Sequence, residues 1–368
     1  MTSNSDTVIT PYEQNSKSME FRQPVLKLFP LRIVHIGKGA FGLDTNRIKQ
    51  EVELTYGKVK SLAGWAVDKN IVLTITSYYV TSDREFDAVR LNRFMDALKN
   101  RSGWFSPLRG NLLPMISALL DRPGCDIEQE VDRLFAKQHV LKSAGFRNTI
   151  HSYLAALLMT DDPDVHEIEA RQAKKLYDAM KKQHFFLTSD DDYAYALLLG
   201  KREADPIEHA KAMRTYYDAL RVAGFKSGNE LQWLSQVMTY IHIDFDEKLV
   251  ARAADILDRF KRDAKVRPVH YPMIGFLTVF EVTDADLETI VDLTVVLETS
   301  KPLKWNREMA LSIGVGYVMH KLVDPVRVEE TSVSLVTSIE LIIQAQQAVM
   351  AATIAVMAAS SASSSSDT

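Results

Sequence analysis

Residues 176–180 read Leu-Tyr-Asp-Ala-Met, and the pattern returns forty positions later as Tyr-Tyr-Asp-Ala-Leu at residues 216–220. A further step of forty gives Ile-Leu-Asp-Arg-Phe at 256–260, and a weaker copy, Val-Leu-Glu, stands at 296–298. Upstream, Phe-Met-Asp-Ala-Leu at 94–98 lies 82 positions, or two units, before the first copy. A fixed period of this length is typical of tandem helical hairpins, in which each unit buries its apolar face against its neighbours.

A turn signal repeats in the same phase. Gly103-Trp104, Gly145-Phe146 and Gly224-Phe225 each follow one charged segment, and His184-Phe185 occupies the same slot. A glycine just past a helix end adopts the left-handed conformation that other residues resist, and an apolar residue after it folds back on the last turn. We therefore expect helices that end at these positions, each with its aromatic residue packed inward.

A second, more apolar helix is expected after each turn, for example over residues 190–201, 229–242 and 271–281. High apolar content suits the inner helix of a pair, whereas the charged segment 167–182 suits the outer one. Residues 70–80 are β-branched and aromatic and would pass alone for a strand, but their phase predicts another inner helix. The prediction is an all-α fold of tandem helical-hairpin repeats of about 40 residues. The array is α-solenoid-like or an α/α superhelix, open or closed.

Four segments follow from this period. Residues 1–44 form a non-repeat N-terminal extension, 45–325 the hairpin repeat domain, 326–359 a C-terminal capping or dimerisation helix, and 360–368 a serine-rich disordered tail. In the extension, the residues Gly-Lys-Gly-Ala at 37–40 can be encoded by a purine-rich ribosome-binding sequence, and Leu43 follows a few codons later. We expect the native protein to start at Leu43, with residues 1–42 as translated leader.

Composition and charge exclude several classes. The 368 residues carry a net charge of −4, which argues against nucleic acid as the main partner, because phosphate binding favours a basic field. One cysteine, Cys125, rules out an internal disulfide. The polar N-terminus has no secretory signal, and no run of apolar residues is long enough to span a bilayer. These features predict a cytoplasmic protein.

Two motifs suggest chemistry that the rest of the chain does not support. Residues 36–42, Ile-Gly-Lys-Gly-Ala-Phe-Gly, match the glycine-rich loop of protein kinases, but the strand lysine and the other kinase motifs are missing. Asp190, Asp191 and Asp192 with His184 could hold a divalent metal. Aspartates at a helix start more often cap free N–H groups. We expect no catalytic residue, no metal and no cofactor.

Stacking the repeats gives the candidate binding site. An offset of forty aligns Asp190 with Glu230 and His270, and Asp192 with Gln232, so the starts of the inner helices would form one polar ridge. Such a ridge is a candidate lining for a groove that holds an extended ligand. The predicted contacts are Asp190, Asp192, Tyr193, Glu230, Gln232, Trp233, Gln236 and His270. The acids at 96, 178, 218 and 258 are expected to make one structural contact between repeats each time.

Three stretches resemble a known family. They are residues 180–193, 228–235 (Gly-Asn-Glu-Leu-Gln-Trp-Leu-Ser) and 104–109 (Trp-Phe-Ser-Pro-Leu-Arg), and they are similar to the bacterial domain-of-unknown-function family 4003. The resemblance would cover about residues 46–359. It implies a bacterial, cytosolic, helical protein and supplies no catalytic residues.

The function expected from these features is that of a non-enzymatic helical-repeat module that binds a protein or peptide, because hairpin arrays present long concave surfaces. The sequence also allows a homo-oligomer that forms through the C-terminal helix. One alternative is a small-molecule-binding protein or enzyme with its site at the inner-helix N-termini. Another is an RNA-binding helical repeat, which would use the basic residues of 174–182 and 261–267.

Overall fold

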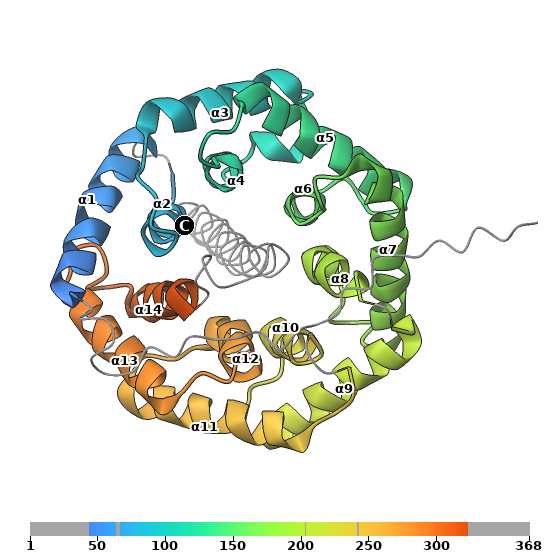
Figure 1. The fold of residues 1–368 in the computed structure, drawn as a ribbon, viewed down its shortest axis with the longest axis vertical. Helices are drawn as coiled ribbons and strands as arrows, with labels where there is room; N and C mark the ends of the chain where they lie inside the picture. Colours follow the sequence, from blue (N-terminus) through green and yellow to red (C-terminus); the bar gives the residue numbers. More distant parts are fainter. Residues whose placement is uncertain (1–43, 64–66, 203, 241–242, 323–368) are drawn as a thin grey trace, which may run out of the picture. The chain divides into compact units, whose positions relative to one another are not determined.

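The computed structural model describes residues 44–63, 67–202, 204–240 and 243–322. The glycine-rich loop, the expected start at Leu43, the C-terminal helix and the serine-rich tail lie outside these residues. Within them every regular element is a helix, so the predicted all-α class is confirmed (Figure 1). No helix in this part of the chain is both long and apolar enough to cross a membrane.

The described helices form two layers. The outer helices carry the charged segments: α1 (Thr45–Ala63), α3 (Ala88–Arg101), α5 (Ile127–Ser143), α7 (His166–Gln183), α9 (Pro206–Val222), α11 (Glu247–Asp263) and α13 (Asp284–Glu298). The inner helices are more apolar: α2 (Lys69–Thr81), α4 (Leu113–Leu120), α6 (Ile150–Leu157), α8 (Tyr193–Gly200), α10 (Asn229–Met238), α12 (Tyr271–Val279) and α14 (Arg307–Leu322). Short 3-10 turns lead into or between them: η1 (Pro107–Arg109), η2 (Pro163–Val165), η3 (Asp190–Asp192) and η4 (Pro268–His270).

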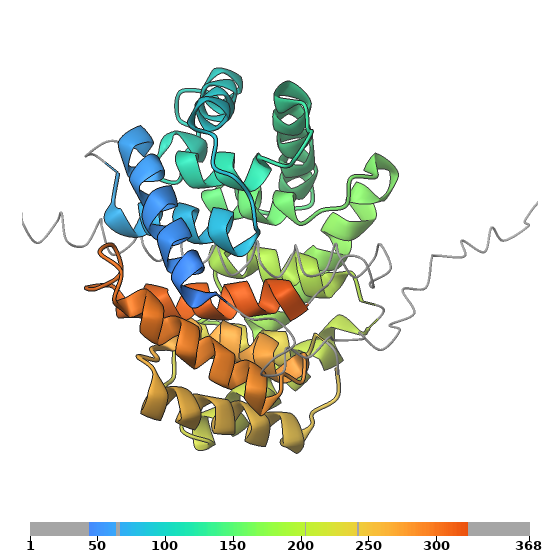
Figure 2. The same cartoon turned by 60° about the vertical axis from the view of Figure 1, so that its left-hand side comes forward.

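The hairpins close on themselves. Each outer helix packs on the inner helix that follows it, and successive hairpins pack side by side. At the end of the series α13 packs on α1, and α14 packs on α2 (Figure 1). Figure 2 shows α13 and α14 running alongside each other close to one end of α1. Side-chain bonds join the same two ends, because Asn306 donates to Asn70 Oδ1 at 3.0 Å and Lys321 donates to Asp83 at 3.4 Å.

The β-branched stretch at 70–80 is an inner helix, as its phase predicts. In α2 every residue from Ile71 to Thr81 is buried. Burial of threonine in a helix leaves its hydroxyl without water, and here Thr74, Thr76 and Thr81 each donate to the carbonyl four residues earlier at 2.8 Å. Packing on both sides therefore overrides the strand preference of this segment.

Inner helices approach their neighbours closely where a glycine faces a helix. A Cβ on Gly200 of α8 would lie 2.9 Å from the backbone N and Cα of Ala173 in α7. A Cβ on Gly275 of α12 would lie 2.8 Å from Leu234 in α10. Neither glycine has a left-handed backbone, so glycine is required at both positions by the narrow space between the helices and not by the backbone conformation.

The predicted helix-end signal is confirmed at two of the four positions. Gly145 and Gly224 have φ of 97° and 99°, and the amides of Phe146 and Phe225 donate to Leu141 O and Leu220 O in the expected capping pattern. Both phenylalanine rings are buried, each only 3% exposed.

At the other two positions the outer helices end as predicted, at Arg101 and Gln183, but the left-handed turn and the inward packing of the aromatic residue are wrong. Gly103 does not have a positive φ, and His184 has φ of −134°. Without the left-handed residue the chain does not turn back on the helix end. Trp104 is therefore 80% exposed and Phe185 66% exposed.

The repeated acids do not make the contact between repeats that their spacing suggests. Each pairs with a basic residue of its own outer helix, three or four positions away. The pairs are Asp96 with Lys99, Asp178 with Lys174, Asp218 with Arg214 and Asp258 with Lys261. The regular spacing therefore reflects one outer-helix surface pattern used again in successive hairpins.

Candidate functional site

Hydrogen bonds connect the starts of neighbouring inner helices, and we call this edge of the hairpin series the N-terminal rim. They join successive hairpins: Arg147 to Asp190, Asn229 to Asp191, Lys226 to Tyr271, His270 to Glu308 and Asn306 to Asn70. Bonds at the other ends of the inner helices define the C-terminal rim: Tyr79 to Asp121, Arg122 to Asp161, Lys201 to Leu158, Arg202 to Tyr240 and Lys321 to Asp83. The predicted site lies on the N-terminal rim.

Asp192 is the centre of the predicted row. Its Oδ1 accepts from Gln232 Nε2 at 3.1 Å and from Gln236 Nε2 at 2.7 Å, and its Oδ2 accepts from the Ser189 amide at 3.0 Å. The forty-residue alignment of Asp192 with Gln232 is thus a direct contact between two hairpins. Complete burial, together with the charge of Asp191, raises the pKa of Asp192 to about 7, although the three hydrogen bonds oppose this shift.

Two atoms beside this carboxylate have no hydrogen-bond partner. They are His184 Nε2 and Gln236 Oε1, and both residues border a cavity of about 10 Å³. His184 Nδ1 lies 3.2 Å from Gln232 Oε1, which ties the imidazole to the same network. A cavity of this size has room for one water molecule. The network therefore has no space for a larger ligand.

Asp190 and Tyr193 hold the neighbouring hairpin. Asp190 Oδ1 accepts from Arg147 Nε at 3.0 Å and from Nη2 at 2.6 Å. The Tyr193 hydroxyl accepts from the Arg147 amide at 3.3 Å, and its ring lies edge-on against Phe146 and Tyr177. These contacts fix α8 against the turn that precedes α6.

His270 is completely buried at the start of α12. Its Nδ1 accepts from the Arg267 amide at 2.8 Å, so the proton sits on Nε2, which donates to Glu308 O at 2.9 Å. Burial lowers the pKa of His270 to about 4, so the ring stays neutral at neutral pH. Trp233 is also buried and stacks on Tyr195 with an interplanar angle of 18°.

Of the predicted contacts, only Glu230 is partly exposed, and the other residues of the set are buried. The structure brings most of them together, but as contacts between hairpins. Their contact with a partner stays a prediction. Among the residues described, no group of three or more His, Cys, Asp or Glu side chains could hold a metal ion.

Exposed aromatic residues lie on turns that lead from an outer helix to the next inner helix. Trp104 and Phe105 follow α3 and are 80% and 95% exposed, and Trp305 precedes α14 and is 80% exposed. Phe185 and Phe186 follow α7 and are 66% and 96% exposed. We call these three turns the aromatic turns. Because they precede inner helices, they belong to the N-terminal rim.

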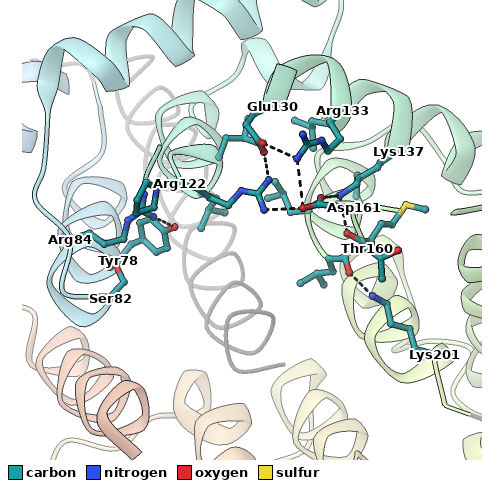
Figure 3. A pocket seen from close by; sticks show the side chains of 18 of the residues that line it. Tyr78, Ser82, Arg84, Arg122, Glu130, Arg133, Lys137, Thr160, Asp161 and Lys201 are labelled. Atoms are coloured by element: carbon teal, nitrogen blue, oxygen red, sulfur yellow. Dashed lines mark hydrogen bonds and ion pairs between the residues drawn. The ribbon is translucent and has the colours of Figure 1, made fainter. Parts of the chain in front are cut away.

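A basic pocket of about 500 Å³ that was not predicted from the sequence lies on the C-terminal rim (Figure 3). Its lining comes from the ends of α2, α4, α6 and α8, from the inward face of α5 and from α14. The cationic lining residues are Arg84, Arg122, Arg133, Lys137 and Lys201. The signal that could have found it is the spacing of Glu130, Arg133 and Lys137, which places three charged residues along one face of α5.

An ion-pair network forms one side of this pocket. Arg122 donates to Glu130 Oε2 at 2.5 Å and to Asp161 Oδ2 at 3.2 Å, and Arg133 donates to Glu130 Oε1 at 2.9 Å. Lys137 Nζ donates to Asp161 Oδ1 at 2.8 Å and to Met159 O at 2.9 Å. Burial would raise the pKa of Asp161, but Lys137 and Arg122 lower it to about 2. Burial lowers the pKa of Lys137.

Comparison with known proteins finds similar sequences. The profile of the family described as "Protein of unknown function (DUF4003)" matches residues 55–348. The "Uncharacterized protein YeaA" of Bacillus subtilis (strain 168) is 28% identical over 308 residues, which cover 81% of this chain and 91% of that protein. No solved structure matches the chain with statistical significance. Since the profile spans most of its length, the chain belongs to family DUF4003.

Proposed function

We propose that this chain is a non-enzymatic interaction module that binds a protein or peptide through the N-terminal rim. The observation that carries the proposal is the exposure of the aromatic turns, where five large rings face solvent. Contiguous exposed apolar surface often marks an interaction site, and tryptophan and other aromatic residues are enriched at interfaces. Large rings also supply much of the binding energy where a partner covers them.

The charges at these turns favour a partner with acidic residues. Lys181 Nζ lies 5.9 Å from the centre of the Phe185 ring, and Arg109 lies 5.9 Å from that of Trp104. At the third turn Lys304 lies 5.5 Å from the Trp305 ring. An acidic side chain that approaches an aromatic turn would therefore meet a cation beside an apolar face.

The buried row behind the turns has a supporting role in this proposal. Phe185 and Phe186 lie in the same connection as Thr188, whose hydroxyl accepts from Gln232. Asp190 and Asp192 hold the start of the next helix. The predicted contacts Asp190, Asp192, Tyr193, Glu230, Gln232, Trp233, Gln236 and His270 would thus fix the turns that touch the partner.

We propose further that the fold is a tandem array of hairpins of about 40 residues and that the protein works in the cytoplasm. The recurring turn and acid pattern supports the array. RNA is less well supported as a partner, because outer-helix cations such as Arg171, Lys174, Arg214 and Lys261 are paired with carboxylates of their own helices.

The test compares partner capture by the parent chain, one double variant and one single control variant. The full chain, purified gently from its native cytosol, is analysed by native mass spectrometry alongside Phe105→Ser/Phe186→Ser and the control Leu54→Ser. Leu54 is 68% exposed on α1 and belongs to none of the aromatic turns. We expect a stoichiometric protein partner with the parent chain and the control, and its loss in the double variant. Equal capture by all three chains would refute the proposal.

A further inference from the structure

The basic pocket of the C-terminal rim is separate from the surface proposed above. It is formed at the opposite ends of the inner helices, and none of the aromatic turns lines it. Its volume of about 500 Å³ falls within the range of roughly 300–1,000 Å³ that small-molecule sites occupy. What it could hold is decided by the charges and the apolar groups of its wall.

Cations outnumber carboxylates in the lining. The pocket is lined by five lysine and arginine side chains and by the carboxylates of Glu130 and Asp161, while Asp121 and Glu169 pair with Arg84 and Lys201 from outside the lining. Glu130 is only 8% exposed, whereas the side chains of Arg122 and Arg133, which contact it, are 45% and 34% exposed. In these two pairs the covered member is the anion, while Asp161, at 53%, is the more exposed member of its pairs with the same arginines.

The two lysines already hydrogen-bond to backbone carbonyl groups of the protein. Lys137 donates to Met159 O and Lys201 donates to Leu158 O, so both satisfy carbonyl groups just beyond the end of α6. This leaves the arginines as the groups best able to meet a ligand. Arg122 and Arg133 both contact Glu130, and they meet at the Asp161 carboxylate, at 3.2 Å and 3.6 Å, which is itself 53% exposed. Paired guanidinium groups suit carboxylate and phosphate oxygens.

The rest of the wall is apolar. Leu119 and Leu120 end α4, Leu157 ends α6, and Leu134 faces the pocket from α5. Tyr78 adds an aromatic ring whose hydroxyl accepts from Arg84 at 2.5 Å. A simple inorganic anion would leave this apolar surface uncovered. The combination favours a molecule with an apolar body and one anionic group.

We infer that the pocket binds a small amphipathic organic anion, with its carboxylate or phosphate against Arg122 and Arg133, beside Asp161, and its apolar body along the leucines that end α4 and α6. The ligand would add one more acceptor to Arg122 and Arg133, which Glu130 and Asp161 already hold in position. The site therefore forms before the ligand arrives.

Isothermal titration of the full chain with octanoate and with phenyl phosphate tests this inference and separates the two anion types. Octan-1-ol and inorganic phosphate are the matched probes that lack the charge or the apolar body. We expect saturable binding of one ligand per chain for at least one of the organic anions. The affinity should fall by about tenfold in Arg133→Met, since a charged hydrogen bond is lost.

Arg133→Met should fold, because Glu130 keeps Arg122 as a partner. Arg122→Met is the second variant, in which Arg133 keeps contact with Glu130. Arg171→Met is the control, because Arg171 makes the same kind of ion pair on the exposed face of α7 and should leave affinity unchanged. The inference is overturned if neither organic anion binds, if octan-1-ol or inorganic phosphate binds as tightly, or if both pocket variants retain the parent affinity.

Discussion

Replacing Gly200 by alanine tests the closest helix approach in the fold. The new Cβ would lie 2.9 Å from the N and Cα atoms of Ala173 and 3.2 Å from the carbonyl carbon of Gln172. All three are backbone atoms, so no side chain can rotate to make room. Helices α7 and α8 must separate instead, and Lys201, the next residue, moves with the end of α8. Overpacking of this kind costs about 1–3 kcal/mol.

Gly57→Ala is the matched control. Gly57 lies within α1, is exposed, and has no atom within 4 Å of the position of a new Cβ. Alanine in a helix interior is favoured over glycine by about 0.5–1 kcal/mol, and at Gly57 nothing offsets this gain. Gly200 is the last residue of α8, so its propensity gain is smaller. The two variants should therefore differ by about 2–3 kcal/mol with opposite signs relative to the parent chain.

Urea unfolding followed by far-ultraviolet circular dichroism measures both effects. We expect a higher midpoint for Gly57→Ala and a lower midpoint for Gly200→Ala, with unchanged slopes. If Gly200→Ala were as stable as the parent, the approach of α8 to α7 would be wrong. If both midpoints moved in the same direction, the packing argument would fail as a whole.

Two further variants test the buried polar groups. Burial raises the pKa of Asp192 to about 7, so the folded state binds more protons than the unfolded state between about pH 4 and pH 7, and stability is lost as the pH rises through this range. Asp192→Asn stays neutral and should remove this loss in urea unfolding; equal midpoint shifts between pH 4 and pH 8 in both chains would contradict the assignment. Burial lowers the pKa of His209 to about 4, so the unfolded state binds more protons between pH 6.5 and 4 and stability is lost as the pH falls. His209→Gln keeps a group that can hydrogen-bond to Thr239 Oγ1 but does not titrate, so it should remove about 3 kcal/mol of the stability lost on acidification. Equal shifts of the unfolding midpoint between pH 8 and pH 4 in both chains would count against the lowered pKa of His209.

The candidate site illustrates how far sequence spacing can be followed. The forty-residue offset identifies Asp192 and Gln232 as neighbours, because adjacent hairpins stack in register. It does not reveal that both are buried, since burial depends on the turns and side chains packed around them. The basic pocket is harder to foresee, because its charges come from Arg84 to Lys201 and meet only when several hairpins lie side by side.

The turns after the outer helices also show what the sequence can predict and what it cannot. Gly145 and Gly224 take the left-handed conformation and bury the rings that follow them, as local chemistry predicts. Gly103 stands in the same slot of the pattern without that conformation, and Trp104 faces solvent. Glycine permits the left-handed turn but does not impose it.

The sequence by itself determines the all-α class, the alternation of charged and apolar helices, and many of their boundaries. These depend on interactions within a few residues, such as the aspartate caps at Asp87, Asp126 and Asp205 and the one-sided charge of the outer helices. Only the tertiary structure decides that α14 packs on α2 and that the inner-helix ends enclose a basic pocket. These contacts join segments that lie far apart in the chain, so no interaction within a few residues encodes them.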